Sequence, residues 1–196
     1  LINNAGVGVN RRIETVDGFE LIFAVNYLAP YVLTNELLSL LKASAPSRVV
    51  TVSSAMHASV KSLDLDDLQS RRRFKWDTAY SRAKLASILF STELARRMEG
   101  TGVSSNSLHP GVIATEFGAD GDLQGLSALM FRVLKWFLPG PETGAQTSLY
   151  VATAPELESV SGRYFEKCRE KVPSELARDE ALAKALWATT EALVAR

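Results

Sequence analysis

The stretch Arg48-Val49-Val50-Thr51-Val52-Ser53-Ser54 decides the fold class of this chain. Its β-branched run is typical of a short strand that is buried on both faces within a parallel sheet. A long helical pattern precedes the strand at roughly residues 16–41, and a second follows at about 77–98. Strands separated by helices of this length predict a doubly wound α/β sheet.

The same alternation of helix and strand continues to both ends of the chain. We expect further strands at residues 1–3, 103–108 and 162–165, and helices near 123–138, 142–152 and 175–194. The 196 residues contain no internal repeat and no low-complexity linker. We therefore expect one domain over residues 1–196.

Composition excludes several classes of function. Lys plus Arg and Asp plus Glu both number 22, so no net charge favours nucleic acid or an anionic membrane. Cys168 is the only cysteine, and the two histidines, His57 and His109, lack the spacing of a metal site. No apolar run is long enough to span a bilayer. We expect no nucleic-acid partner, no metal and no transmembrane segment in this chain.

Tyr80 and Lys84 lie four residues apart on the second long helix, so both side chains project from one face. A tyrosine pKa near 10 is too high for ready proton exchange at pH 7, and a neighbouring ammonium lowers it. Such a pair can protonate a carbonyl oxygen, or take a proton from an alcohol in the reverse direction. The alternative is an exposed pair on a helix surface.

Polar residues also interrupt or follow the other apolar elements. Ser53 and Ser54 end the strand, where a hydroxyl can bind a substrate oxygen or simply stabilise a turn. Asn26 interrupts the apolar face of the first helix, and Pro30, four residues later, has no N–H to donate to its carbonyl. We expect a kink there, with the free carbonyl and the amide holding an ordered water. The alternative is a helix that bends or ends at Pro30.

Pro110-Gly111 follows the expected strand at 103–108, and Thr115 comes shortly after. Glycine allows a ligand to approach the backbone closely, although proline and glycine are also ordinary turn residues. In open α/β sheets, ligands bind beyond the carboxyl ends of the strands. The polar residues expected at that edge are Asn3, Ser53, Ser54 and His109.

The order of these motifs resembles the short-chain dehydrogenase/reductase family over essentially the whole chain. The matches are Asn3-Asn4-Ala5-Gly6 with its Asn-Asn-Ala-Gly motif, Asn26 with its catalytic asparagine, Ser54 with its serine, Tyr80 and Lys84 with its Tyr-x-x-x-Lys pair, and Pro110 to Thr115 with its Pro-Gly-x-x-x-Thr segment. The resemblance implies a Rossmann-type fold and an NAD(P)-dependent oxidoreductase that interconverts a carbonyl and an alcohol.

The family implies a role for each matched position. Tyr80 would be the general acid/base, Lys84 would lower its pKa and bind the nicotinamide ribose, and Ser54 would polarise the carbonyl. Asn26 would anchor a water in a proton relay. The cofactor-binding positions would be Asn3, Ala5, Gly6, Tyr80, Lys84, Pro110, Gly111, Val112 and Thr115.

Within the family, the chain is similar to the retinol dehydrogenase-type branch. The segments that carry this similarity are Leu65-Asp66-Asp67-Leu68, His109-Pro110-Gly111, Leu138 to Glu142 and Gly144 to Thr147. The branch implies reduction of retinal-like or other lipophilic aldehydes and ketones with NADPH, NAD being the alternative. The apolar pattern at 126–137 would form a flap over the substrate; a core helix or an interfacial membrane helix are the alternatives. Ala29 and Pro30 depart from the usual glycine and histidine.

The chain opens with Leu1 rather than a methionine, inside what looks like a strand. We expect a fragment that lacks the first strands and the Gly-rich phosphate-binding turn, about 80 residues at βαβ dimensions. We expect a cytoplasmic location, with membrane association through the missing part left open. The family's long helices often pair between subunits, so a homodimer is the alternative to solvated helices.

A catalytically inactive binding or scaffold protein with the same fold is the competing function. Degenerate members of the family lose the tyrosine, the lysine or the serine. Because Asn26, Ser54, Tyr80 and Lys84 are all present, the sequence favours the enzyme.

Overall fold

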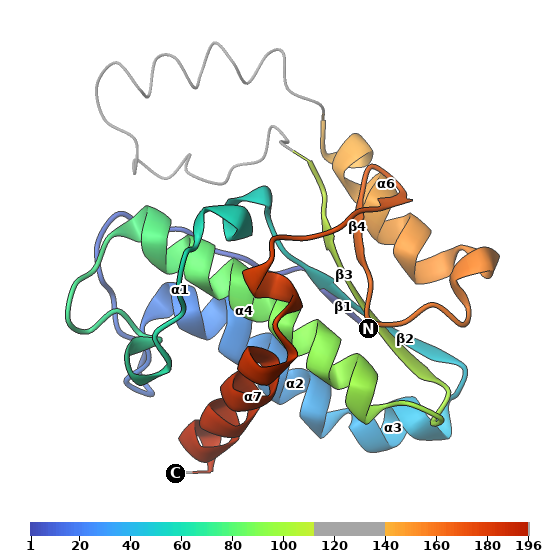
Figure 1. The fold of residues 1–196 in the computed structure, drawn as a ribbon, viewed down its shortest axis with the longest axis horizontal. Helices are drawn as coiled ribbons and strands as arrows, with labels where there is room; N and C mark the ends of the chain where they lie inside the picture. Colours follow the sequence, from blue (N-terminus) through green and yellow to red (C-terminus); the bar gives the residue numbers. More distant parts are fainter. Residues whose placement is uncertain (112–139, 196) are drawn as a thin grey trace.

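A five-stranded sheet forms the centre of the computed structural model, which describes residues 1–111 and 140–195 (Figure 1). The strands, in their order across the sheet, are β1 (Ile2–Asn3), β2 (Ser47–Val52), β3 (Val103–His109), β4 (Tyr164–Glu166) and β5 (Arg169–Glu170). Neighbouring strands from β1 to β4 run parallel, and β5 is antiparallel to β4. The α/β class predicted from the sequence is confirmed, and the carboxyl ends of β1, β2 and β3 meet at one edge.

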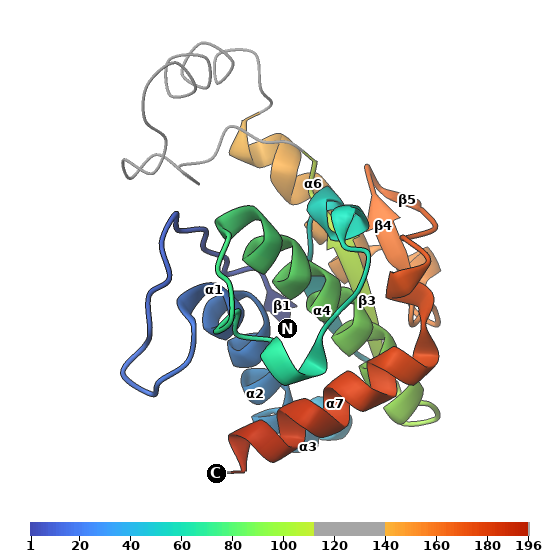
Figure 2. The ribbon, with the colours of Figure 1, turned by 60° about the vertical axis from the view of Figure 1, so that its left-hand side comes forward.

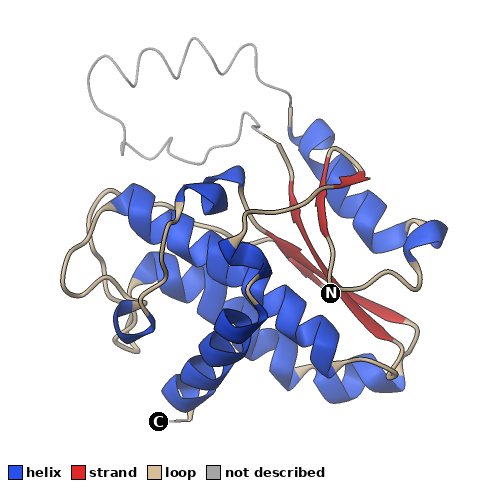
Figure 3. Cartoon of the chain, in the orientation of Figure 1, coloured by secondary structure: helices blue, strands red, loops and turns tan. Residues whose placement is uncertain are grey.

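Helices cover both faces of the sheet (Figure 3). One face carries α1 (Leu21–Phe23), the π-helical turn η1 (Ala24–Leu28), α2 (Ala29–Glu36), α3 (Leu38–Ala43) and α4 (Trp76–Arg97). The other face carries α6 (Pro141–Thr153). The last helix, α7 (Glu180–Val194), packs across α4 on the side away from the sheet (Figure 2). The part of the chain that the structure describes also contains short 3-10 turns: η2 (Ala55–Ser59), η3 (Leu65–Asp67), η4 (Pro155–Leu157) and η5 (Leu176–Arg178).

The β-branched run of β2, Val49–Val52, is buried throughout because both of its faces are covered. Val49 belongs to the large hydrophobic cluster beneath α4, whereas Val50 and Val52 belong to a second cluster with Val151 of α6. Successive strand side chains point to opposite faces, so a strand between two helical layers needs an apolar residue at nearly every position.

The first helix begins at Leu21, so the expectation of a start near residue 16 is wrong. Thr15 and Gly18 close a tight turn in which the Thr15 N–H donates to the Phe19 carbonyl, at 2.8 Å, and Gly18 adopts a φ of +78°. Val16 points fully into solvent at the tip of this turn. Because glycine adopts the left-handed region readily, the chain turns at Gly18, and the helix begins only after this turn.

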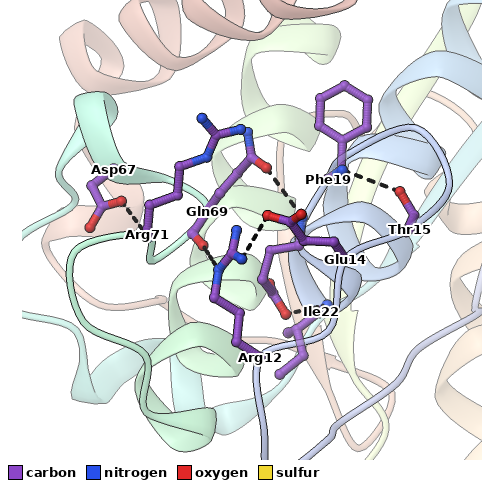
Figure 4. A network of polar contacts seen from close by, with 9 residues as sticks. Arg12, Glu14, Thr15, Phe19, Ile22, Asp67, Gln69 and Arg71 are labelled. Atoms are coloured by element: carbon purple, nitrogen blue, oxygen red, sulfur yellow. Dashed lines mark hydrogen bonds and ion pairs between the residues drawn. The ribbon is translucent and has the colours of Figure 1, made fainter.

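Glu20 caps this helix and joins it to a distant loop. Its two carboxylate oxygens accept hydrogen bonds from the N–H groups of Ile22 and Phe23, both at 2.8 Å. Its own N–H donates to the side-chain oxygen of Gln69, at 3.2 Å. Arg12 reaches the Gln69 carbonyl from the other side, at 3.5 Å, so the network of Figure 4 ties the loop before α1 to the loop after η3.

The remaining expected elements differ from the structure by small amounts. α4 was expected over 77–98 and α6 over 142–152, and both are confirmed within one residue at each end. The expected helix over 175–194 divides into η5 and α7, because Asp179 adopts an extended conformation and caps α7 through the N–H of Leu182. Strand β5 was not expected; it follows a two-residue turn at Lys167 and Cys168, both with positive φ. The helix expected near 123–138 lies outside the described residues.

We predict that Glu20→Ala destabilises the protein by roughly 1–2 kcal/mol, because two N–H groups at the start of the helix lose their acceptor. The free energy of unfolding from denaturant titration measures this change. Glu36→Ala, at an exposed position in α2, is the control and should stay within about 0.5 kcal/mol of the wild type. Equal stability of the two variants would contradict the role of the cap.

Candidate active site

Two reciprocal hydrogen bonds dock α4 on the carboxyl end of β2. The Lys84 ammonium donates to the Val52 carbonyl at 3.0 Å, and the Ser53 hydroxyl donates to the Lys84 carbonyl at 2.7 Å. Both side chains are 3% exposed. The Ser53 hydroxyl is therefore buried and already bonded to α4. This leaves Ser54 as the serine of this edge whose hydroxyl can face a substrate.

Tyr80 lies one helical turn before Lys84 and meets Ser54. The Tyr80 phenol forms a hydrogen bond with the Ser54 side chain, and the Lys84 ammonium stands 5.6 Å from the centre of the Tyr80 ring. The Ser54 hydroxyl oxygen also accepts from the N–H of Met56 at 3.2 Å, at the start of η2. The structure thus brings together the serine, tyrosine and lysine that the sequence singled out.

The pKa of Tyr80 moves in the direction opposite to the one expected from sequence. Burial raises the pKa of this phenol, and the hydrogen bond with Ser54 lowers it by less. Burial lowers the pKa of the Lys84 ammonium to about 8. Loss of solvation therefore outweighs the hydrogen bond with Ser54, and the net shift of the Tyr80 pKa is upward, whereas the lowering of this pKa by Lys84 stays a prediction.

Asn26 lies in the π-helical turn η1, close to the same point. Its side-chain N–H₂ donates to the carbonyls of Val7, at 2.8 Å, and Ile22, at 2.9 Å. The side-chain oxygen of Asn26 is buried, and no group among the described residues donates to it. An unpartnered buried acceptor costs stability, so this oxygen is a candidate contact for a hydroxyl, an amide or a water.

The backbone carbonyl of Asn26 is not free, which corrects the expectation built on Pro30. The Ser87 hydroxyl of α4 lies 3.0 Å from this carbonyl and 2.9 Å from that of Ala83, and serves as donor. The helix neither ends nor breaks at Pro30; it widens into a π turn and continues as α2. The sequence indicates that Pro30 cannot donate to the Asn26 carbonyl. It does not reveal that Ser87 donates instead, because Ser87 lies 61 residues away.

Gly6 approaches both Asn26 and Lys84 at the surface of this edge. A Cβ atom at Gly6 would lie 3.0 Å from the Asn26 side-chain oxygen and 3.4 Å from the Lys84 nitrogen. Ala5 and Gly6 are exposed, whereas Asn3 is buried and donates from its side-chain nitrogen to the Thr34 hydroxyl at 3.0 Å. Glycine at this position keeps the space beside the two polar groups open.

Pro110 and Gly111 follow β3 at the same edge, and Gly111 adopts a φ of +96°. Val112 and Thr115 lie outside the described residues, as does the apolar pattern at 126–137. Within the described ranges no helix is both long and apolar enough to cross a membrane. Nor does any group of three or more His, Cys, Asp and Glu side chains in those ranges have the arrangement of a metal site.

Comparison with known proteins agrees with this geometry. The family model described as short chain dehydrogenase matches residues 1–123. The chain belongs to the short-chain dehydrogenase family. Its similarity to this family includes the segments that carry Gly6, Asn26, Ser54, Tyr80 and Lys84.

Retinol dehydrogenases are among the relatives of this chain. Human retinol dehydrogenase 14 is 47% identical over 195 residues, which are 99% of this chain and 58% of that protein. Human retinol dehydrogenase 13 is 46% identical over 198 residues, covering 99% and 60%. A crystal structure of a protein from Mycobacterium paratuberculosis superposes with a TM-score of 0.73 at 33% identity, over 98% of this chain and 65% of that one. The chain therefore spans about three fifths of the length of the curated relatives it matches.

We predict that Ser87→Ala destabilises the protein by about 1–3 kcal/mol, because the buried Asn26 carbonyl loses the hydroxyl donor that reaches it from α4. Denaturant unfolding measures the loss. Thr92→Ala is the control: its hydroxyl bonds within α4 to the carbonyl of Ile88, and its removal should cost no more than about 0.5 kcal/mol. A Ser87→Ala variant as stable as the control would show that another group satisfies the carbonyl.

The buried ammonium of Lys84 makes a prediction about pH. A lysine whose pKa is lower when folded binds fewer protons folded than unfolded between about 8 and 10.5, so the wild type gains stability as pH rises through that window. We expect Lys84→Met to be more stable than the wild type at pH 7 by on the order of 1–2 kcal/mol, and this advantage to shrink between pH 8 and 10.5.

Denaturant unfolding at pH 7, 9 and 10.5 checks this expectation, with Lys184→Met at an exposed position of α7 as the control. A constant difference between Lys84→Met and the wild type across the three pH values would contradict it.

Proposed function

We propose that this short-chain dehydrogenase interconverts a carbonyl and an alcohol with a nicotinamide dinucleotide, and that Tyr80 is its general acid/base. The observation that carries the proposal is the hydrogen bond between Tyr80 and Ser54 beside the buried Lys84 ammonium. Two hydroxyl groups that already contact each other can both reach one substrate oxygen, and a cation stands next to the group that would lose a proton.

The three side chains divide the work in carbonyl reduction. Ser54 donates a hydrogen bond that orients the substrate oxygen, and Tyr80 delivers a proton to that oxygen as the carbonyl carbon receives a hydride. The phenolate left on Tyr80 carries a negative charge, and the Lys84 ammonium, 5.6 Å from the ring, stabilises it. In alcohol oxidation, the Tyr80 phenolate accepts the hydroxyl proton instead.

The residues around Asn26 fit a nicotinamide dinucleotide. Gly6 leaves room for a close approach, and the unpartnered Asn26 oxygen can accept a hydrogen bond from a ribose hydroxyl or from a water of the relay. The dinucleotide supplies or accepts the hydride when it is bound. Asn3, Ala5, Gly6, Lys84, Pro110 and Gly111 would hold it, together with Val112 and Thr115.

The finer form of the proposal is NADPH-dependent reduction of retinal-like or other lipophilic aldehydes and ketones. Its support is the similarity to retinol dehydrogenase 14 and 13. A series of straight-chain aldehydes tests the substrate class: kcat/KM should rise by roughly tenfold for each one to two methylene groups that the site buries. A kcat/KM that does not depend on chain length would limit the proposal to its general form.

We predict that Tyr80→Phe, in the protein expressed from its complete natural coding sequence, lowers kcat by about 10²–10⁴-fold. The dissociation constant for the dinucleotide should change by less than about twofold, because only the phenolic proton donor is removed. Steady-state kinetics and a binding titration measure the two quantities.

Tyr150→Phe, on α6, is the matched control and should keep wild-type activity. A Tyr80→Phe variant that turns over at the wild-type rate would remove Tyr80 from its role. A wild type that binds the dinucleotide but consumes none with any aldehyde would favour the inactive binding protein.

A further inference from the structure

We propose that His57 is a positioning residue for Ser54, clamping the loop after β2 to the C-terminal segment through both of its ring nitrogens. The inference rests on the proposed function, because it assigns Ser54 to the substrate oxygen. His57 itself lies three residues beyond Ser54, in η2.

The two bonds of His57 determine where its proton lies. Nδ1 is 2.7 Å from the Ser54 carbonyl oxygen, and the Ser174 N–H points to Nε2 at 3.2 Å. A carbonyl can only accept and an N–H can only donate, so Nδ1 carries the proton and Nε2 is bare. His57 is therefore a neutral imidazole with one defined tautomer, and its side chain is 4% exposed.

The surroundings of His57 oppose its protonation. Its ring lies edge-on to Tyr164 of β4, with ring centres 5.2 Å apart. Among the described residues, the charge of Lys171, which is paired with Glu166, acts on His57, and His57 and His109 of β3 act on each other. Burial lowers the pKa of His57, and the charge of Lys171 lowers it further. The hydrogen bond to the Ser54 carbonyl raises this pKa, but by less than burial lowers it. A second proton on Nε2 would face the Ser174 N–H and break the clamp.

The clamp closes a ring of contacts that joins Ser54 to the helix of Tyr80. Ser174 leads directly into η5 and α7, whose Trp187 stacks on Phe90 of α4 with ring centres 5.7 Å apart. α4 in turn carries Tyr80 and is docked on β2 next to Ser54. Ser54 is therefore held relative to Tyr80 in two ways. The docking of α4 on β2 fixes one, and the bonds of His57 to the C-terminal segment fix the other.

Three substitutions separate the two bonds of His57. Asparagine can place an N–H₂ near the position of Nδ1 and keep the bond to the Ser54 carbonyl, whereas glutamine can place an oxygen near Nε2 and keep only the bond from Ser174. Alanine removes both. All three are made in the protein expressed from its complete natural coding sequence, with Ser59→Ala in the same turn as the control, since that hydroxyl donates only to the Met56 carbonyl and Ser81.

We expect His57→Ala to lower kcat by roughly 10–100-fold while the KM for the dinucleotide stays within about twofold, because misplacement of Ser54 affects the reacting oxygen and not the cofactor. His57→Asn should recover most of kcat, and His57→Gln should recover little, although both variants lose one bond and melt at similar temperatures. Ser59→Ala should match the wild type.

Two results would overturn the inference alone: an active wild type whose kcat is unchanged in His57→Ala, or equal loss of kcat in the asparagine and glutamine variants. A wild type without turnover would overturn the proposed function and this inference with it. Nitrogen-15 NMR of the wild type gives a test that needs no variant. It should show His57 neutral with the proton on Nδ1 at pH 7, and a proton on Nε2 would refute the clamp.

Discussion

The docking of Lys84 on the end of β2 is the contact on which the rest of the site depends. One residue of α4 both donates to the strand, through its ammonium, and accepts from it, through its carbonyl. These two bonds fix the height of α4 along the strand and its rotation about its own axis. Tyr80, one turn earlier on the same face, then meets Ser54, the residue next to the one that makes the second bond.

This arrangement carries a cost in stability. A buried ammonium is poorly solvated, and its pKa falls toward 8 as a result. The Asn26 side-chain oxygen is buried without a donor among the described residues, and the backbone carbonyl of Asn26 accepts a hydrogen bond from Ser87 of α4. Polar groups that destabilise a fold and converge on one edge of a sheet are typical of sites where binding or chemistry compensates for the cost.

Sequence reasoning succeeded where one local pattern determines the structure. The β-branched run of β2 and the 22-residue helix α4 follow from periodicity, and the place of Ser54 at the sheet edge follows from the order of the strands. The place of Tyr80 in the site was implied only by the resemblance to the family. The start of the first helix was missed although the Asp17-Gly18 pair signals a turn, because the apolar pattern was extended backwards through Phe19. Ser87 and His57 could not be assigned from sequence, since their partners, Asn26 and Ser174, are brought to them only by tertiary folding. The sign of the Tyr80 pKa shift likewise depends on burial, which a four-residue spacing does not report.

The central claim is that Ser54 and Tyr80 act on one substrate oxygen while Lys84 stays docked beside them. A crystal structure of the protein from its complete coding sequence, with a nicotinamide dinucleotide and a lipophilic alcohol bound, tests this claim most directly. We predict that the alcohol oxygen lies about 2.6–3.2 Å from both the Ser54 and the Tyr80 hydroxyl oxygens. An alcohol oxygen that contacts neither hydroxyl, or a Lys84 side chain withdrawn from the Val52 carbonyl and the Tyr80 ring, would contradict the account.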